Sequence, residues 1–324
     1  MGKITQAILH ITYVCSHHCP MCYANANTNI QHPKLEQLCK IVDKLIEDDV
    51  MDITLVGGDP AIYPDIVPLV HYCYQNGVML SILSNTLDFG GKKEQVADKV
   101  QVFEGTIHHS SPLYHDNFCG VTGAYDNLIK NLKYFSDCKK SVGLAINIIP
   151  YNYEVLFDLV KNMIEQGVNI DHIILQRIIQ FGRAIGSSEY EITCDMLNKA
   201  LEQIERIELE LGVRIIFEDP VPVCSIKEKF HRFMHPCEWG ITKISLDYDG
   251  NISRCGTDVF HTIGSIFEQD IQKTLNENLS ITQFREKGYL PIKCKQCDKF
   301  GICGGGCPIS RAPEKGYTLD YLAQ

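Results

Sequence analysis

The sequence lacks the features that would place the protein in a membrane or outside the cell. Its N-terminal segment carries one lysine and a short alternating apolar run, without the apolar core and small-residue cleavage site of a secretory signal. No apolar run is long enough to span a bilayer. Low-complexity stretches are absent, and a content of 45% hydrophobic and 22% charged residues is ordinary for a folded protein. We therefore expect a cytoplasmic protein that folds throughout its length.

Positive charge is also scarce. The chain has 30 Lys and Arg against 40 Asp and Glu, which gives a formal net charge of -10. An acidic surface opposes non-specific binding to the phosphates of nucleic acid and to anionic lipid. We therefore expect neither nucleic acid nor a membrane as a partner.

Cysteine, in contrast, is abundant. The chain has 15 cysteines, and without a secretory signal they are expected to stay reduced and available for metals or catalysis. They gather in two regions, one between Cys15 and Cys22 and one that begins at Cys224. The scattered remainder is expected to consist mostly of small core residues. The remainder comprises Cys39, Cys73, Cys119, Cys138 and Cys194.

Short β-branched runs alternate with longer amphipathic segments in the first part of the chain, which is the pattern of repeated βα units. Strands are predicted at Ala7–Tyr13, Asp52–Val56, Val78–Leu83, Val100–His108, Val142–Ile149 and Ile173–Ile179. Helices are predicted at Leu35–Glu47, Ile66–Gln75, Lys92–Ala97, Ala124–Phe135 and Val155–Gln166. A full eight-stranded barrel needs about 250 residues. We therefore expect an α/β fold with a partial (β/α)6 TIM-type barrel.

The second part of the chain has a different character. A helix is predicted at Cys194–Leu211 and a strand at Val213–Phe217, after which turn residues dominate. The sequence Asp249-Gly250-Asn251 predicts a hairpin. Such a segment has little apolar surface to bury, so we expect it to need metal to fold. The predicted domains are a barrel over 1–215 and a small cysteine-rich α+β domain over 216–324.

The first cysteine motif follows the first predicted strand, where the loops of a barrel place chemistry. Cys15, Cys19 and Cys22 could hold three irons of a [4Fe-4S] cluster and leave the fourth iron open to a small molecule. Zinc is the alternative, because His17 or His18 could supply the fourth ligand that a structural zinc site needs.

The spacing C-x3-C-x2-C after a first strand resembles the radical SAM superfamily. In that superfamily the open iron binds S-adenosylmethionine (SAM), and reduction of the bound cofactor yields a 5'-deoxyadenosyl radical. The resemblance implies a [4Fe-4S] cluster at Cys15, Cys19 and Cys22 and SAM as a cofactor. It also implies that Tyr23, an aromatic residue directly after the motif, lies near the adenine.

A second match follows the second predicted strand. Gly57, Gly58 and Asp59, followed by a proline, resemble the Gly-Gly-Glu-Pro sequence whose backbone and carboxylate face the methionine amino group in the superfamily. Aspartate in place of glutamate keeps the charge but shortens its reach. An ordinary turn is the alternative reading of these residues.

Polar residues at the ends of the later strands are further candidates for SAM binding. Their position resembles that of polar loops in the superfamily, and Arg183 lies in a Gly-Arg-Ala sequence that resembles one found after the sixth strand. Simple loop capping is the alternative, and a surface arginine would look the same. These candidates are Ser84, Asn85, Thr106, Asn147 and Arg183.

The C-terminal cysteines have a long and specific spacing. Gly250-x4-Cys255 precedes a C-x2-C-x5-C-x3-C sequence, a pattern that resembles the SPASM extension of radical SAM enzymes, which binds auxiliary iron–sulfur clusters. The resemblance implies two ligand groups, Cys237, Cys255 and Cys307 for one cluster and Cys294, Cys297 and Cys303 for a second.

Each of these groups lacks a fourth ligand. Cys224, upstream of the first group, is the predicted fourth ligand of the first cluster. The chain has no cysteine after Cys307, so the second cluster departs from the SPASM pattern. Asp320, substrate or a hydroxide could complete the second cluster, or that cluster could be smaller or absent. Zinc at the last four cysteines is the alternative.

The resemblance implies an enzyme that abstracts hydrogen from its substrate by radical chemistry. We expect the substrate to be a ribosomally made peptide and the product to carry a cross-link, an epimerised residue or an oxidised side chain. The same chemistry on a small metabolite and a non-enzymatic iron–sulfur or zinc protein are the alternatives. Expected partners are a reductant such as flavodoxin or ferredoxin and a separate leader-binding protein. Cys119 is a candidate hydrogen donor, with an inert buried thiol as the alternative.

Overall fold

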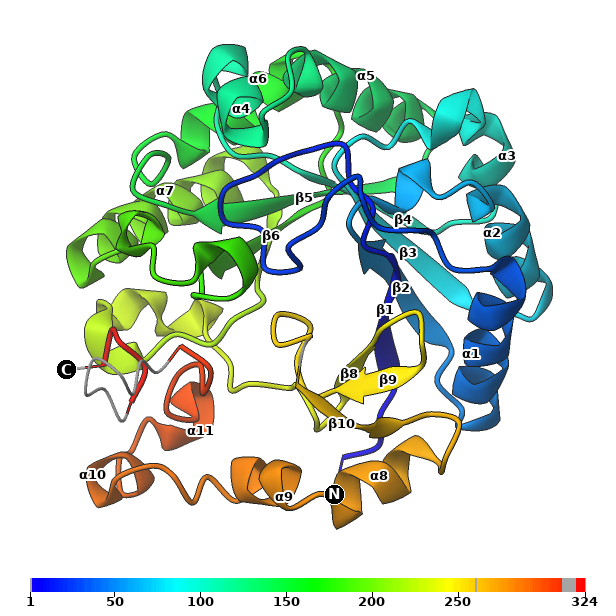
Figure 1. Cartoon of the computed structure of the whole chain (residues 1–324). Coiled ribbons are helices and arrows are strands. Elements are labelled where there is room, and N and C mark those ends of the chain that lie inside the picture. The colour runs from blue at the N-terminus through cyan, green and yellow to red at the C-terminus, as the bar shows by residue number, and fades with distance from the viewer. Residues whose placement is uncertain (1, 260, 311–318, 324) are drawn as a thin grey trace.

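The computed structural model describes residues 2–259, 261–310 and 319–323. Its strands form one ten-stranded sheet in the order β10-β9-β8-β1-β2-β3-β4-β5-β6-β7 (Figure 1). The strands are β1 Gln6–Thr12, β2 Asp52–Gly57, β3 Met79–Ser84, β4 Val102–Thr106, β5 Ser141–Ile148, β6 His172–Arg177, β7 Arg214–Phe217, β8 Lys243–Leu246, β9 Asn251–Ser253 and β10 Thr262–Ser265. The helices are α1 Leu35–Glu47, α2 Ile66–Gln75, α3 Lys93–Ala97, α4 Pro112–Cys119, α5 Ala124–Asp137, α6 Leu156–Glu165, α7 Cys194–Leu211, α8 Ile271–Glu277, α9 Leu279–Arg285, α10 Ile292–Lys295 and α11 Phe300–Cys303.

The first seven strands form the partial barrel. Each pairs in parallel with the next strand of the chain, and helices α1 to α7 cover the outside of the curved sheet (Figure 1). The prediction of an α/β partial barrel is therefore confirmed. The sheet continues beyond the barrel, because β8 pairs in parallel with the free edge of β1 and β9 returns antiparallel to β8. The C-terminal part thus shares its sheet with the barrel.

The helices and strands predicted up to residue 217 all occur, with bounds that differ by at most about two residues. Three helices, α1, α2 and α7, have the predicted bounds. No helix was predicted before Gly120, but Pro112–Cys119 forms α4. Proline at the first turn and Gly120 in the left-handed conformation at the C-terminus define this helix. A helix of eight residues with polar side chains on several faces has no clear apolar period in the sequence.

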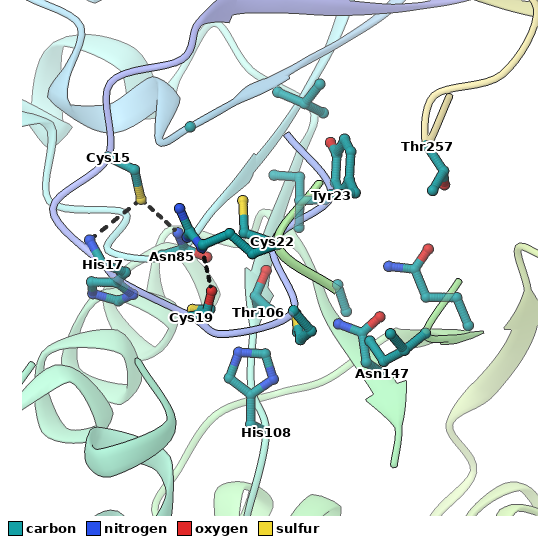
Figure 2. A pocket seen from close by; sticks show the side chains of 18 of the residues that line it. Cys15, His17, Cys19, Cys22, Tyr23, Asn85, Thr106, His108, Asn147 and Thr257 are labelled. Carbon is teal, nitrogen blue, oxygen red and sulfur yellow. Dashed lines mark hydrogen bonds between the residues drawn. The ribbon is translucent and has the colours of Figure 1, made fainter. Parts of the chain in front are cut away.

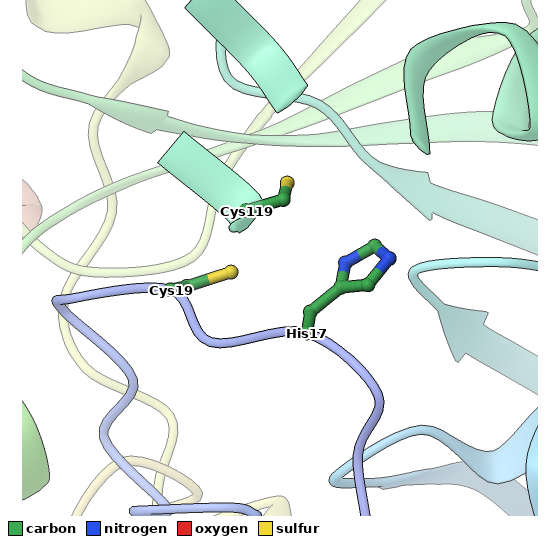
Figure 3. Close-up of side chains that lie close together, drawn as sticks. All are labelled: His17, Cys19 and Cys119. Carbon is green, nitrogen blue, oxygen red and sulfur yellow. The ribbon is translucent and has the colours of Figure 1, made fainter. Parts of the chain in front are cut away.

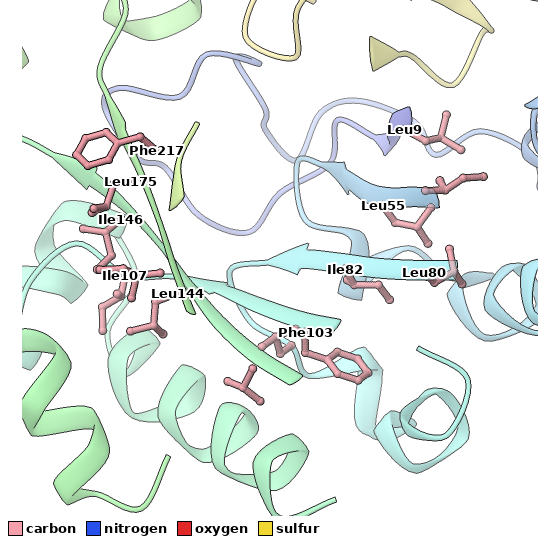
Figure 4. Packing of buried hydrophobic residues seen from close by; sticks show 14 of the residues in the cluster. Leu9, Leu55, Leu80, Ile82, Phe103, Ile107, Leu144, Ile146, Leu175 and Phe217 are labelled. Carbon is pink, nitrogen blue, oxygen red and sulfur yellow. The ribbon is translucent and has the colours of Figure 1, made fainter. Parts of the chain in front are cut away.

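Alternation along the strands separates two faces of the sheet. Leu9, Leu55 and Leu80 pack with the helices in the main hydrophobic core (Figure 4). Their neighbours in sequence, such as Thr54 and Ser81, line a cavity on the inner face. Successive side chains of a strand point to opposite faces. The outer face therefore packs against the helices, while the inner face can hold polar side chains that contact a ligand.

The C-terminal part is short of regular structure. Its hairpin turns at Gly250, whose φ of 80° allows the tight connection between β8 and β9. Helices α8 to α11 follow and pass along the open side of the barrel (Figure 1). Across the described ranges no helix has both the length and the apolar character needed to cross a membrane.

Candidate functional site

The motif cysteines lie on the loop that follows β1, at the carboxyl ends of the barrel strands. The backbone N–H of Cys15 donates to the carbonyl of Asn27 (3.2 Å), which closes this loop on itself. Cys15, Cys19 and Cys22 all line one cavity of about 120 Å3 (Figure 2). The structure therefore brings together the three thiols that the spacing predicted as cluster ligands.

Cys15 lies deepest among polar neighbours. Its sulfur accepts hydrogen bonds from the backbone N–H of His17 and from the side-chain amide of Asn85, each at 3.4 Å. Burial, together with the charge of Asp59, raises the pKa of the Cys15 thiol to about 12. A metal that binds thiolates offsets this cost, because the ligand form of cysteine is the anion. Asn85 thus contacts a predicted cluster ligand and lines the cavity.

Two glycines bring the β2 loop against the cluster loop. A Cβ on Gly57 would lie 2.0 Å from the carbonyl oxygen of Thr12, and a Cβ on Gly58 would lie 2.1 Å from that of Val14. The backbone N–H of Gly58 donates to Thr12 (2.7 Å), so the approach is held by hydrogen bonding. Both glycines line the cavity, and any side chain at either position would collide with backbone.

Asp59 and Ser84 bind each other behind the cavity wall. Ser84 donates a hydrogen bond to Asp59 (2.6 Å), and Thr86 donates to the other carboxylate oxygen (2.7 Å). Neither Asp59 nor Ser84 is among the residues that line the cavity. Their side chains hold the ends of β2 and β3 together, and their contact with SAM stays a prediction.

The other predicted cofactor residues lie around the same cavity. Tyr23, Thr106 and Asn147 line its wall (Figure 2). Arg183 lines it too, and its guanidinium donates to the carbonyls of Cys19 (2.9 Å) and Ala26 (2.6 Å). Arg183 therefore braces the cluster loop from the far side of the barrel.

Cys119 approaches the cluster loop from α4 instead of from the cavity. His17, Cys19 and Cys119 place ligand atoms within 4.8 Å of one another (Figure 3). A hydrogen bond from the Cys119 thiol lowers the pKa of Cys19 well below its usual value. Cys119 is buried and does not line the cavity, so the geometry does not support it as a hydrogen donor to a bound substrate.

The sequence analysis missed several wall residues. Gln176 and Arg177 line the cavity from β6, and Thr257 reaches it from the C-terminal part. His108, which follows Thr106 by two positions just after β4, lines the cavity too, as the strand period favours. No local signal marks Thr257, because only the pairing of β8 with β1 brings its loop to the barrel.

The C-terminal cysteines fall into two groups, which we call the inner set and the outer set. The inner set is Cys237, Cys255 and Cys307, all buried and all lining a second cavity of about 390 Å3. The outer set is Cys294, Cys297 and Cys303, which are more exposed and lie outside that lining. This division matches the two ligand groups that the spacing implied.

Asp320 is engaged elsewhere. Its carboxylate accepts two hydrogen bonds from Arg177 (3.0 and 2.9 Å) and one from the backbone N–H of Cys307 (2.9 Å). The N–H of Leu322 donates to it as well (3.1 Å). With both oxygens occupied, Asp320 is not available to the outer set. The structure therefore argues against the suggestion that Asp320 completes the second cluster.

The two cavities are adjacent. Tyr23, Gln176 and Thr257 are among the residues that line both. The motif cysteines therefore lie on one side of these shared walls and the inner set on the other, and we call the two cavities together the interior space. Charged groups of both signs, including Glu104 and Arg177, line the larger cavity.

The residues present fit an iron–sulfur cluster with bound SAM. Three thiols share one cavity, and two glycines let the β2 loop pack directly against the backbone of the loop that carries those thiols. The buried Nδ1 atoms of His17 and His108 have no hydrogen-bond partner among the described residues, so the wall keeps polar atoms for a ligand. A zinc site at the first motif fits less well, since the compact His17–Cys19–Cys119 group leaves out Cys15 and Cys22.

Comparison with known families gives the same result. The model of the radical SAM superfamily matches residues 9–174. The chain belongs to this superfamily. The SPASM iron–sulfur cluster-binding domain matches residues 237–298. The chain is therefore a radical SAM enzyme whose cofactors are SAM and iron–sulfur clusters.

Three relatives illustrate the range of similar proteins. PqqA peptide cyclase of Ruegeria pomeroyi is 21% identical over 93% of this chain and 81% of its own length. AdoMet-dependent heme synthase of Oleidesulfovibrio alaskensis is 24% identical over 91% of this chain and 80% of its own. The structure of Streptococcus suis SuiB bound to precursor peptide SuiA superposes with a TM-score of 0.79 and 19% identity, over 100% of this chain and 76% of SuiB. The last likeness concerns the fold.

Proposed function

We propose that this radical SAM enzyme modifies a ribosomally made peptide, with one or two residues of the peptide inserted into the interior space. The observation that carries the proposal is that the cavity of the motif cysteines shares wall residues with the larger cavity beside the inner set. The larger cavity, about 390 Å3, is near the lower end of the roughly 300–1,000 Å3 typical of ligand sites. A short stretch of chain suits such a volume.

When bound at Cys15, Cys19 and Cys22, the cluster and SAM supply a primary carbon radical that can take hydrogen from an unactivated C–H bond. The protein's own residues position substrate and keep water out. Tyr23, Gln176 and Thr257 stand where the two cavities join, so they would contact the reacting part of the substrate. Positioning of this kind is the main contribution a protein makes to such a step.

Two relatives support a peptide substrate by their names, PqqA peptide cyclase and SuiB with its precursor peptide. The heme synthase is 24% identical over a similar length, and it supports a second candidate, a small-molecule substrate. We further propose that a low-potential donor such as flavodoxin or ferredoxin reduces the protein and that a separate protein binds the leader. We also propose that the enzyme works in the reducing cytoplasm, which suits its free cysteines.

The test is transfer of deuterium from substrate to 5'-deoxyadenosine. Candidate precursor peptides with deuterated residues, and deuterated small metabolites as a second arm, would be incubated anaerobically with the reconstituted enzyme, reductant and SAM. A Cys15→Ala/Cys19→Ala/Cys22→Ala variant serves as the control and should form no 5'-deoxyadenosine. Deuterium transfer from a peptide supports the proposal. Transfer from metabolites alone would replace it with the second candidate.

A further inference from the structure

The fourth ligand of the auxiliary clusters can be sought from the surroundings of Cys224. This residue lies in a single helical turn, Val223–Ser225, just after the barrel ends. The N–H of Ser225 donates to the carbonyl of Pro222 (3.0 Å), and Asn198 donates to the carbonyl of Ser225 (2.9 Å). His231 bonds the carbonyl of Val223 (3.1 Å). The backbone of the turn is thus fixed, while the side chain of Cys224 remains exposed.

This turn packs against the C-terminal cysteine-rich segment. A Cβ on Gly306, which lies between Cys303 of the outer set and Cys307 of the inner set, would be 2.8 Å from the ring of Pro222. Lys299, between two cysteines of the outer set, pairs with Glu228 at 3.7 Å on the segment after the turn. The region around Cys224 therefore borders the outer set in space, although about 70 residues of sequence separate Cys224 from Cys294.

Exposure also separates the two sets. Cys224 is exposed like Cys297, whereas all three cysteines of the inner set are buried.

The cavity gives an independent indication. Cys237, Cys255 and Cys307 line the interior space, and Cys224 does not. All 15 cysteines lie within the described residues, and no other cysteine lines the larger cavity. No fourth cysteine therefore lines the cavity with the inner set. Cys224, in contrast, lies on a segment that contacts the chain around the outer set.

We propose that Cys224 is the fourth thiolate of the outer set, with Cys294, Cys297 and Cys303, and that the inner set has only three thiolates, at the wall of the substrate cavity. This reverses the assignment that the sequence suggested. Four thiolates complete an iron–sulfur cluster and suit it to electron transfer near the surface. Three thiolates beside the cavity leave one coordination position for a ligand that is not a cysteine, such as substrate.

The experiment places Cys224→Ala in two backgrounds. The first lacks the inner set through Cys237→Ala/Cys255→Ala/Cys307→Ala, and the second lacks the outer set through Cys294→Ala/Cys297→Ala/Cys303→Ala. Each protein is reconstituted anaerobically with iron and sulfide, and iron, acid-labile sulfide, zinc and the electron paramagnetic resonance of the reduced state are measured. Cys138→Ala, another exposed cysteine, is the matched control in both backgrounds.

Each background should start with about eight irons, since a [4Fe-4S] cluster contributes four. Cys224→Ala leaves the outer set three thiolates, which can still hold four irons, so in the first background it should change the electron paramagnetic resonance of the reduced outer cluster because one iron loses its thiolate. In the second background the spectrum and the iron content should stay unchanged. Loss in the second background, equal effects in both, or no effect in either would overturn the proposal. Stoichiometric zinc in place of iron at the outer set would overturn it as well.

A labelling experiment covers the case in which a triple variant fails to fold. In the otherwise unchanged chain, alkylation of Cys224 by iodoacetamide is followed by mass spectrometry before and after reconstitution. Cys224 should react freely in the metal-free protein and be protected at least tenfold after reconstitution, while Cys138 stays reactive in both. An unprotected Cys224 in fully reconstituted protein would contradict the proposal. Neither readout requires peptide turnover, so the outcome is separate from that of the proposed function.

Discussion

Arg177, the last residue of β6, binds Asp320 with two guanidinium N–H groups at 3.0 and 2.9 Å, across 143 positions of sequence. The same arginine binds Asp219 through its Nε (2.6 Å). All three side chains are buried, or nearly so. The N–H of Cys307 also donates to Asp320 (2.9 Å). The ion pair therefore links the inner-set residue Cys307 to the carboxyl end of β6.

Removal of the Asp320 charge should weaken this attachment without removing a cluster ligand. Asp320→Asn leaves Arg177 with one carboxylate, and we expect the free energy of unfolding to fall by roughly 3 kcal/mol, as for other broken buried pairs. Iron content under native conditions should stay unchanged. Anaerobic urea unfolding and iron analysis check this, with exposed Asp298→Asn as the control. Iron loss at unchanged stability would instead make Asp320 a ligand.

The close approach of the β2 loop to the cluster loop predicts intolerance to any side chain. Gly58→Ala would place a methyl group 2.1 Å from the carbonyl oxygen of Val14. The loops must separate, so we expect a loss of about 3 kcal/mol in stability and a large loss of SAM binding. Thermal unfolding and equilibrium dialysis with SAM measure both. Gly288→Ala, where no atom lies within 4 Å, should behave as wild type.

Arg183 should act by positioning the cluster loop. Its two hydrogen bonds to the carbonyls of Cys19 and Ala26 need the planar, forked guanidinium. Arg183→Lys keeps the charge but cannot make both bonds, so we expect SAM cleavage to fall on the order of 10²-fold, as for a displacement of about 1 Å. Iron content should stay near that of wild type. Equal loss of iron and activity would mean that the arginine is needed for assembly of the cluster.

Regular elements were predictable where the sequence has a clear period or cap. The bounds of α7 follow from Thr193, which accepts from the N–H of Met196, and from Gly212 in the left-handed conformation. The helix α4 was missed because it is short and lacks a clear apolar face. Within α4, Asp116 accepts hydrogen bonds from the N–H groups of Gly123 and Tyr125, a contact visible only once the fold is known.

The candidate site was predictable to the extent that it follows local spacing. The motif cysteines and Gly57-Gly58 stand at the ends of consecutive strands, so position along the chain sufficed. Arg177 and Thr257 were missed, because closure of the sheet and the β1–β8 pairing bring them to the cavity. The hydrogen-bond partners of Asp59 were not predictable for the same reason, since they come from β3 and the loop that follows.

Buried His10 predicts a pH dependence of stability. Neither ring nitrogen has a partner among the described residues, and burial lowers its pKa to about 3 beside the rings of Tyr13 and Tyr23. In the unfolded chain His10 is protonated below about pH 6.5, whereas in the folded protein it stays neutral down to about pH 3. Stability is therefore lost as pH falls from 6.5 toward 3, by about 1.4 kcal/mol per pH unit.

The variant His10→Leu should remove this contribution. Anaerobic urea unfolding of both proteins at pH 8 and pH 5.5 would measure the change. The loss of stability on acidification should be about 1 kcal/mol smaller in the variant. His71→Leu, on the partly exposed face of α2, should leave the difference between the two pH values as in wild type. Equal acid sensitivity of His10→Leu and wild type would show that His10 does not carry the effect.

The variants of Cys119 can distinguish two roles, tuning of the cluster potential and hydrogen donation to substrate. Its thiol hydrogen-bonds to Cys19 from outside the cavity, so it should tune the cluster instead of donating hydrogen to substrate. A net hydrogen bond of about 1 kcal/mol corresponds to about 40 mV for a one-electron couple. Because a donor to a ligand sulfur stabilises the reduced cluster, Cys119→Ala should lower the potential by that amount. Cys119→Ser, which keeps a donor, should restore it.

Spectroelectrochemical titration of the cluster measures the shift, and product analysis with the deuterated substrate measures the chemistry. We expect Cys119→Ala to form the same product as wild type, at a rate that recovers when a stronger reductant is supplied. A variant that keeps the potential and cleaves SAM but returns an unquenched or altered product would assign hydrogen donation to Cys119. In that case α4 must move during turnover, because in this structure the helix holds the thiol behind the cluster loop.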